Sequence, residues 1–282
     1  NPGHPGYPYE EATAWVLLAA ARLRGTPAGQ VLEAPAEDAA RVLAQIASAT
    51  GGLGRGGRRY LFDTAVGLAA LDAWGGHEAA GDRLFATLKA FCAERRAVDG
   101  GPVAGAETAA TAWSEAWGSH LLWVHVALQP RGERALAADL TADLVQTCSR
   151  PDGAFRIHAA SARAYAHATA YAAAGLLAHG GGPERARAGD AAEALFRAQR
   201  PVSSVAGSGC VAAWLDAPKV SGETRPFVVD DVDMDLPPDV DVVVWEPPGA
   251  EHLLIAHDGP EMAAYGGLLD FMAASIAAGT IP

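Results

Sequence analysis

Cysteine is scarce in this sequence, and its spacing excludes several familiar arrangements. Only three cysteines occur in 282 residues, at positions 92, 148 and 210, and no two of them form a C-x-x-C pair. An odd number of widely spaced cysteines is not the pattern of a disulfide framework. We therefore expect three free thiols in a reducing compartment, which predicts a cytoplasmic protein.

Long apolar runs and excess basic charge are also missing. No apolar run reaches the roughly 18 residues that a membrane span needs, and no secretory signal is visible in a chain that starts at Asn1. The formal charge is −12, which argues against nucleic acid or an anionic membrane surface as partner, because both need clustered Lys and Arg. We expect a small-molecule or peptide substrate, without metal or cofactor; the sequence does not indicate an oligomeric state.

Aromatic residues make up only 7% of the chain, whereas half of all residues are hydrophobic. Alanine supplies much of this apolar content, and alanine is the strongest helix former and lets helices pack closely. With 19% charged residues the composition is that of a globular chain. It favours a helical protein.

A Thr-Ala pair returns along the chain at intervals of about fifty residues. It occurs at Thr13, Thr64, Thr111 and Thr169, and three of the four copies open onto long Ala/Leu-rich runs. Charged amphipathic segments lie between the copies. A period of this length that holds two helical segments is typical of repeats built from helical hairpins.

The apolar patterns predict eight helices, which alternate in character. Their expected ranges are 9–24, 36–48, 60–74, 79–96, 107–128, 133–148, 161–179 and 184–199. The first, third, fifth and seventh are apolar nearly all round, which predicts inner positions, and the others have one charged face, which predicts outer positions. The fold class is therefore predicted as all-α, an α/α barrel (toroid) of five to six helical hairpins. The loops that precede the inner helices should form the rim of a pocket.

The pattern changes after position 201. Residues 205–215 are expected to form a short inner helix and 262–278 a last one, while 219–260 contains strand-like runs such as D-V-D-V-V-V-W. We predict a single domain over 1–282 with 219–260 as an acidic strand and loop insertion. Six aspartates lie between Asp230 and Asp241; we interpret them as a solvated cover facing the arginines of 55–59, with a Mg²⁺ or Ca²⁺ site as the alternative.

Three segments resemble the inner-helix motifs of the α/α-toroid enzymes. They are Y-P-Y-E-E-A-T-A-W at 7–15, Y-L-F-D-T-A-V-G-L at 60–68 and Y-A-H-A-T-A-Y-A-A-A-G-L-L at 165–177. This superfamily includes terpene cyclases, protein prenyltransferases, glucuronyl C5-epimerases and unsaturated-glucuronyl hydrolases. The resemblance implies the fold and not the reaction, because the fold hosts many chemistries. The D-x-D-D acid motif of the terpene side and the Cys-Cys-His zinc set of lanthionine-synthetase-type barrels are absent.

Three carboxylates are candidate catalytic groups. Glu11 lies two residues before its Thr-Ala pair and Asp63 lies immediately before the next, while Glu115 stands where the other copies have apolar residues. Each has a plainer interpretation: Glu11 as a charge at the helix N-terminus, Asp63 as the partner of nearby arginines, and Glu115 as an outward-facing side chain. His167 and Tyr171, one turn apart on the most apolar helix, are candidates for proton transfer or for ordinary core packing.

The remaining candidates would bind substrate. The glycine- and arginine-rich stretch 51–63 is expected to be a flexible basic loop that recognises an anion. The tryptophans of 107–128 would either pack in the core or stack on a sugar. The predicted substrate-binding residues are Tyr7, Tyr9, Arg55, Arg59, Tyr60, Trp113, Trp117, Arg156 and His158.

These candidates predict an enzyme that acts on a sugar, uronate or similar polar metabolite by acid–base chemistry, as a hydrolase, lyase or epimerase. A terpenoid or other natural-product cyclase is the first alternative. A non-catalytic peptide- or ligand-binding barrel in a biosynthetic pathway is the second.

Overall fold

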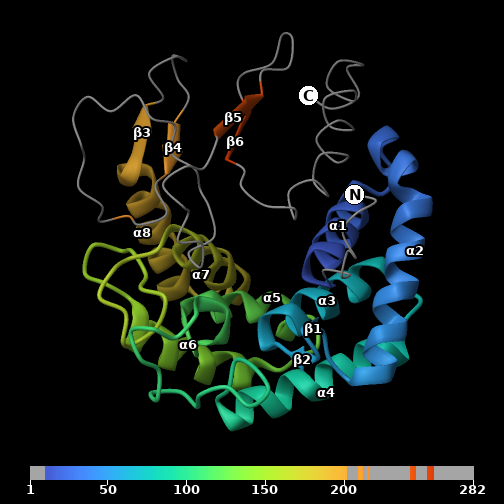
Figure 1. Cartoon of the computed structure of the whole chain (residues 1–282), viewed down its shortest axis with the longest axis horizontal. Helices are drawn as coiled ribbons and strands as arrows, with labels where there is room; N and C mark the ends of the chain where they lie inside the picture. Colours follow the sequence, from blue (N-terminus) through green and yellow to red (C-terminus); the bar gives the residue numbers. More distant parts are fainter. Residues whose placement is uncertain (1–9, 202–208, 212–214, 216–241, 246–252, 257–282) are drawn as a thin grey trace. The chain divides into compact units, whose positions relative to one another are not determined.

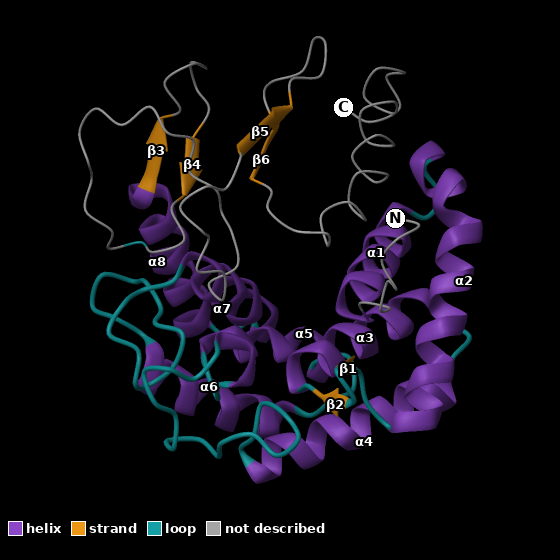
Figure 2. Ribbon diagram, viewed as in Figure 1, coloured by secondary structure: helices purple, strands orange, loops and turns teal. Residues whose placement is uncertain are grey.

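The computed structural model describes residues 10–201, 209–211, 215, 242–245 and 253–256. The chain falls into two compact units, one of Tyr9–Arg197 with Trp214–Asp216 and one of the remaining residues. The first unit contains nearly all the described structure and is mostly helical, which confirms the all-α prediction for this part of the chain (Figure 2). The single-domain prediction over 1–282 stays a prediction.

The helices and the short hairpin follow one another in chain order (Figure 1). They are α1 (Glu10–Leu23), α2 (Pro27–Thr50), β1 (Gly54–Arg55), β2 (Arg58–Arg59), α3 (Leu61–Trp74), α4 (Glu78–Glu94), the 3-10 turns η1 (Trp113–Glu115) and η2 (Ser119–Val124), α5 (His125–Leu128), α6 (Arg134–Cys148), α7 (Ala166–His179) and α8 (Gly182–Ala198).

Helix α2 begins well before the expected position 36. The hydroxyl of Thr26 accepts a hydrogen bond from the Gly29 N–H at 3.1 Å, and Pro27 occupies the first turn, a position that tolerates its missing N–H. The helix then continues through Pro35, whose side chain is exposed. The capping residues, and not the internal proline, set its start.

Helix α3 is the centre of the first unit. Residues 61–71 are all buried, and the helix packs against α1, α2, α4, η2 and α5. One row of elements packs side by side in the order α1, α3, η2 with α5, and α7. Helices α2, α4 and α6 pack outside this row (Figure 1). The burial predicted for an inner helix is therefore observed for α3, whereas the toroid arrangement stays a prediction. Helices α1 and α7 each keep one face open, as the exposed Val16 and Leu177 show.

The predicted helix over 107–128 is wrong. Only η1, η2 and the single turn α5 form there, and much of the segment is loop (Figure 2). The reason lies at Gly118, whose extended backbone bridges His158 and approaches the Ile157 carbonyl so closely that a Cβ would stand 2.1 Å from its oxygen. Ser119 donates its N–H to the same oxygen at 2.9 Å. These contacts across the chain replace the helical pattern.

The glycine-rich stretch 51–63 is a tight hairpin and not a flexible loop. Strands β1 and β2 pair antiparallel, and Gly56 and Gly57 join them with φ values of 58° and 76°. Two consecutive positive φ values are the mark of a type I′ turn, which glycine adopts without strain. The hairpin leads directly into α3.

Three short strand pairs complete the described structure, the β1–β2 hairpin included. Strand β3 (Gln199–Pro201) pairs with β4 (Gly209–Val211), and β5 (Val242–Trp245) pairs with β6 (Leu253–Ala256). The β5–β6 pair confirms strands within 219–260, whereas β4 contradicts the helix expected at 205–215. The acidic stretch 230–241 and the helix expected at 262–278 lie outside the described residues. Among the described helices, none is both long and apolar enough to cross a membrane.

Candidate functional site

Two of the repeated threonines hold the chain before their inner helix in the same way. Thr64 Oγ1 accepts the N–H of Leu53 at 3.1 Å, and Thr169 Oγ1 accepts the N–H of Phe155 at 3.0 Å. The carbonyl of Leu53 also accepts the N–H of Tyr60, the N-cap of α3, at 2.8 Å. In the same way the carbonyl of Phe155 accepts the N–H of Tyr165, the N-cap of α7, at 2.9 Å. The third copy differs, because Thr111 lies in a turn and bonds Thr108. We call the two matching arrangements the threonine clips.

The threonines also define equivalent positions on the inner helices, because Thr13, Thr64 and Thr169 are each the fourth residue of their helix. Two positions before the threonine stand Glu11, Phe62 and His167. Two positions after it stand Trp15, Val66 and Tyr171. Side chains at a common helical offset point in the same direction relative to the helix start, so these residues converge from neighbouring helices.

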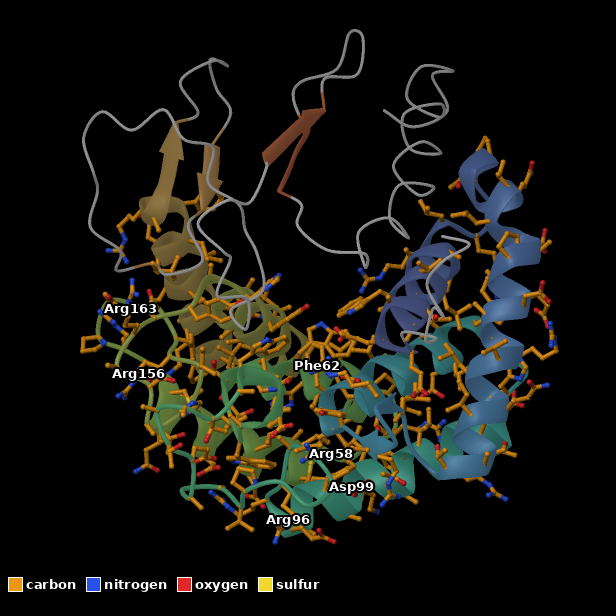
Figure 3. The ribbon with its side chains drawn as sticks, in the orientation of Figure 1. Arg58, Phe62, Arg96, Asp99, Arg156 and Arg163 are labelled. Atoms are coloured by element: carbon orange, nitrogen blue, oxygen red, sulfur yellow. The ribbon has the colours of Figure 1, made fainter. Side chains whose placement is uncertain are left out.

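The convergence produces a cluster of four aromatic side chains, Trp15, Phe62, Trp123 and Tyr171, which we call the aromatic cluster. Trp15 lies 4.9 Å from Trp123 and 6.2 Å from Tyr171, and Phe62 lies 4.8 Å from Tyr171, measured between ring centroids. The ring of His167 stacks on Tyr171 beside the aromatic cluster, with 5.6 Å between the ring centroids. Figure 3 labels Phe62, which comes from the first turn of α3. Phe62 and Trp123 are buried, whereas Trp15, Tyr171 and His167 are partly exposed.

Two buried carboxyl groups adjoin the aromatic cluster. Glu11 accepts the indole N–H of Trp15 at 3.1 Å, and Asp63 follows Phe62 on α3. Burial and the charge of Glu11 raise the pKa of Asp63 to about 8, and the nearby Arg55 opposes this shift. The Oδ2 atom of Asp63 has no hydrogen-bond partner among the described residues. Asp63 therefore keeps its proton near neutral pH.

Glu10 also acts on this pair, because its charge contributes to the raised pKa of Asp63. Its carboxylate accepts the N–H of Gly54 at 2.6 Å, which ties α1 to the hairpin before α3. Burial raises its pKa, and the bond to Gly54 limits the rise. The two adjacent glutamates thus serve different purposes, because neighbouring positions on a helix point about 100° apart.

The structure accordingly brings together four of the five predicted catalytic residues. Glu11 contacts Trp15, which stacks near Tyr171, and Tyr171 stacks on His167, while Asp63 interacts electrostatically with Glu11. Sequence reasoning missed Trp15, Phe62 and Trp123. The signal for the first two was present in their fixed offset from the threonine, but Trp123 lies in the segment whose helix does not form.

Glu115, the fifth predicted catalytic residue, belongs to an ion pair. It lies on η1 and not on an inner helix, and its carboxylate is 2.6 Å from Arg58. Arg59 is paired in the same manner with Asp99 at 2.7 Å, and this guanidinium lowers the pKa of Asp99. Figure 3 shows Arg58 and Asp99 near one another, where Arg58 donates to the Asp99 carbonyl.

These ion pairs argue against the prediction that the basic stretch 51–63 recognises an anion. Of the three hairpin arginines, two already face a carboxylate, and Arg55 lies over the ring of Tyr60 at 4.7 Å while it also acts on Asp63. Tyr60 itself is buried at the N-cap of α3. These contacts of the arginines stabilise the hairpin, and they do not leave the arginines available as a cluster of cations for a ligand.

Trp113 and Trp117, the two predicted binding tryptophans of 107–128, have different surroundings, since the expected helix is absent. Trp117 is buried and donates its indole N–H to Asp143 at 2.6 Å, with Arg95 over its ring at 5.7 Å. This is a packing role. Trp113 meets the edge of His120 at 5.2 Å, and His120 in turn lies 5.6 Å from Phe62.

His120 and His158 belong to a second set of buried polar side chains. Burial lowers the pKa of His120 to about 3, with a smaller contribution from the charge of His158. Burial also lowers the pKa of His158, which Glu107 opposes. Arg156 donates to the Thr147 carbonyl at 3.2 Å. No local sequence signal could join Glu107 to His158, because they are far apart in the chain.

Within the described residues no group of His, Cys, Asp and Glu side chains has the arrangement of a metal site. The predicted substrate-binding residues Tyr7 and Tyr9 lie outside the described part of the chain.

Comparisons with protein-family models, with curated proteins and with solved structures found no match to this chain.

Proposed function

We propose that this protein is an acid–base enzyme that acts on a polar metabolite at Glu11 and Asp63, and that its row of inner helices belongs to an α/α toroid. The observation that carries the proposal is the raised pKa of Asp63, about 8, beside the carboxylate of Glu11. A buried carboxyl group whose pKa is raised toward neutral pH is a usual general acid, and a neighbouring carboxylate can serve as the base, as in hydrolases and lyases.

In this proposal Asp63 donates a proton to a leaving group or carbonyl oxygen, and Glu11 accepts one. Tyr171 and His167 lie beyond Trp15 and are positioned to pass a proton to or from the far side of the substrate. Trp15 fixes the orientation of Glu11 through its 3.1 Å hydrogen bond. A sugar or related polar metabolite suits this set, since sugars stack on tryptophan faces. A uronate would depend on Arg55 alone, because Arg58 and Arg59 are paired.

A cyclase acting on an apolar substrate is a second candidate, and the aromatic cluster favours it. The four aromatic rings would shape a hydrocarbon, and Asp63, next to Phe62 in the chain, would protonate it. The presence of a second carboxyl group, Glu11, in the same place favours the acid–base enzyme on a polar substrate.

The test is a screen with chromogenic glycosides and uronides, followed by single substitutions. Asp63→Asn should lower turnover by about 10²- to 10⁴-fold, the usual contribution of general acid catalysis, and remove the alkaline limb of the pH profile. The exposed Asp139 on α6 provides the matched control, and Asp139→Asn should leave turnover unchanged. Full activity in Asp63→Asn would refute the assignment.

A further inference from the structure

Glu10 makes a hydrogen bond that the helix it begins does not need. A carboxylate in the first turn usually serves as a charge at the helix N-terminus. Glu10 instead accepts the N–H of Gly54 in β1 at 2.6 Å, 44 positions further along the chain. The side chain is half-buried, and burial raises its pKa. Because burying a carboxylate costs free energy, the bond calls for an explanation beyond the stability of α1.

The residues that follow the two threonine clips are structurally equivalent. Gly54 follows the residue that Thr64 holds, and Arg156 follows the residue held in the second clip. Gly54 pairs with Arg59, and Arg156 pairs with Ala164. Both partners come immediately before the N-cap of the next inner helix. The backbone N–H groups of Gly54 and Arg156 can therefore be compared directly.

These two N–H groups have different acceptors. The N–H of Arg156 donates to the backbone carbonyl of Cys148, the last residue of α6, at 3.0 Å. The N–H of Gly54 donates to the carboxylate of Glu10 on α1. The fold thus satisfies this position with a backbone carbonyl in one copy, so a buried carboxylate is not required for the fold in the other.

The bond joins the two helices that carry the proposed acid and base. Thr64 on α3 holds the residue before Gly54, and Glu10 on α1 holds Gly54 itself. In the sequence, Glu11 is next to Glu10, and Asp63 is next to Thr64. Each carboxyl group of the proposed site is therefore adjacent to a residue that binds the same short stretch of chain.

The charges around Asp63 make this geometry measurable. The ionisable groups that act on it are Glu11 and Glu10 from α1 and Arg55 from the hairpin, and Glu11 has the largest effect of the three. The interaction between two charges weakens as the distance between them grows. The effect of Glu11 on the pKa of Asp63 therefore reports how closely the starts of α1 and α3 are held together.

We propose that Glu10 is a positioning residue, which holds α1 against the hairpin through its bond to Gly54 and so keeps Glu11 close to Asp63. The importance of Glu10 for a reaction rests on the proposed function, whereas its effect on the two carboxyl groups does not.

The test measures the interaction between Glu11 and Asp63 in different Glu10 variants of the full chain. The pKa of Asp63 is followed by ¹³C NMR of the aspartate carboxyl groups, with Asp63→Asn to assign the signal. Glu11→Gln should lower this pKa by at least about half a unit. In a Glu10→Ala background the same substitution should have an effect at least about twofold smaller. In a Glu10→Gln background, whose amide oxygen still accepts the Gly54 N–H, the effect should keep its full size.

Glu78 provides the matched control, because it begins α4 and also accepts a glycine N–H, that of Gly76 at 3.2 Å. Glu78→Ala should leave the effect of Glu11→Gln unchanged. If Glu10→Ala does not fold, Glu10→Asp replaces it, since its side chain is one methylene shorter. A full-sized effect in the Glu10→Ala background would overturn the proposal. An effect reduced equally in Glu10→Gln would assign the influence of Glu10 to its charge and would also overturn it.

Turnover separates this role from the proposed function. With a chromogenic substrate that the protein cleaves, Glu10→Ala should lower turnover at least about tenfold, since misplaced groups are costly, and Glu10→Gln should restore most of it. Turnover that is insensitive to Asp63→Asn would refute the acid–base role and leave the NMR result standing. Turnover that depends on Asp63, with a Glu11 effect independent of Glu10, would support the reaction and refute the positioning role.

Discussion

At the scale of single residues, Asp63 and His120 make opposite contributions to stability as the pH changes. Asp63 has a pKa raised from 3.8 to about 8, and that of His120 is lowered from 6.5 to about 3. Both shifts have burial as their first cause, because burial favours the neutral form of each group. A shifted pKa makes the free energy of unfolding depend on pH between the unfolded and folded values.

For Asp63, the folded state binds the proton more tightly than the unfolded state between about pH 4 and 8. The free energy of unfolding should therefore fall as pH rises through this window, by at most about 1.4 kcal/mol per pH unit from this group. Asp63→Asn cannot ionise, so its stability should decline less between about pH 5 and 8. Urea denaturation at both pH values tests this, with Asp139→Asn as control. An equal decline in both variants would contradict the assigned pKa.

For His120, the sign is reversed. The unfolded chain takes up a proton below about pH 6.5 that the folded state refuses until about pH 3, so stability should be lost as the pH falls through this window. His120→Phe places an apolar ring beside Phe62 and Trp113 and should make the acid decline shallower. Chemical denaturation at about pH 6.5 and 4.5 measures it. A decline as steep as that of the unchanged protein would show that His120 is not the group concerned.

At the scale of elements, the threonine clips join each inner helix to the loop before it. Thr64 and Thr169 are fully buried, and each satisfies a backbone N–H that would otherwise have no partner. Thr64→Val and Thr169→Val should each lower the free energy of unfolding by about 1–3 kcal/mol, the cost of an unsatisfied buried polar group. Thr111→Val is the control, because its turn is partly exposed, and it should change stability by less than about 0.5 kcal/mol.

Urea denaturation of the three valine variants decides this prediction. The clip interpretation requires similar losses at Thr64 and Thr169, since their hydrogen bonds differ by only 0.1 Å. A loss at one of them alone, or an equal loss at Thr111, would mean that the two arrangements are not equivalent.

Elements with strong periodicity and clear ends could be predicted from the sequence, and the others could not. Helix α3 begins one residue after its expected start and ends at Trp74 as expected, because its apolar run lies between a hairpin and Gly75. The segment 107–128 has an equally helical composition, but Gly118 forms a β-bridge with His158 and Ser119 donates its N–H to the Ile157 carbonyl, both far along the chain. Contacts of that kind have no local signature.

The same distinction holds for the candidate site. Glu11 and His167 could be identified because they occupy one offset from a repeated threonine. The arginines of the hairpin were expected to be free for a ligand, but Arg58 and Arg59 found partners in Glu115 and Asp99. Which carboxylate reaches a basic loop depends on tertiary packing, which the sequence alone does not reveal.

At the scale of the whole molecule, ion pairs join different elements of the compact unit Tyr9–Arg197. Arg131, after α5, contacts Asp72 at the end of α3 at 2.5 Å and Asp82 on α4 at 2.6 Å. Arg95 joins the end of α4 to Asp143 on α6 at 2.8 Å. In a chain with a net charge of −12, these cations lie where neighbouring helices bring carboxylates together. Each pair that remains exposed contributes at most about 1 kcal/mol.

The threonine clips have a consequence for how such a scaffold acquires new chemistry. The clips at Thr64 and Thr169 tie the starts of α3 and α7 to the preceding chain through backbone contacts, and do not involve the side chains two positions before each threonine. Glu11, Phe62 and His167 already show an acid, an aromatic ring and an imidazole at one structural address. Gene duplication can therefore first copy the helix with its threonine, and the residue two positions before the threonine can change afterwards. For protein engineering, the position two residues before the threonine is therefore where a functional group can be exchanged while the clip itself is kept.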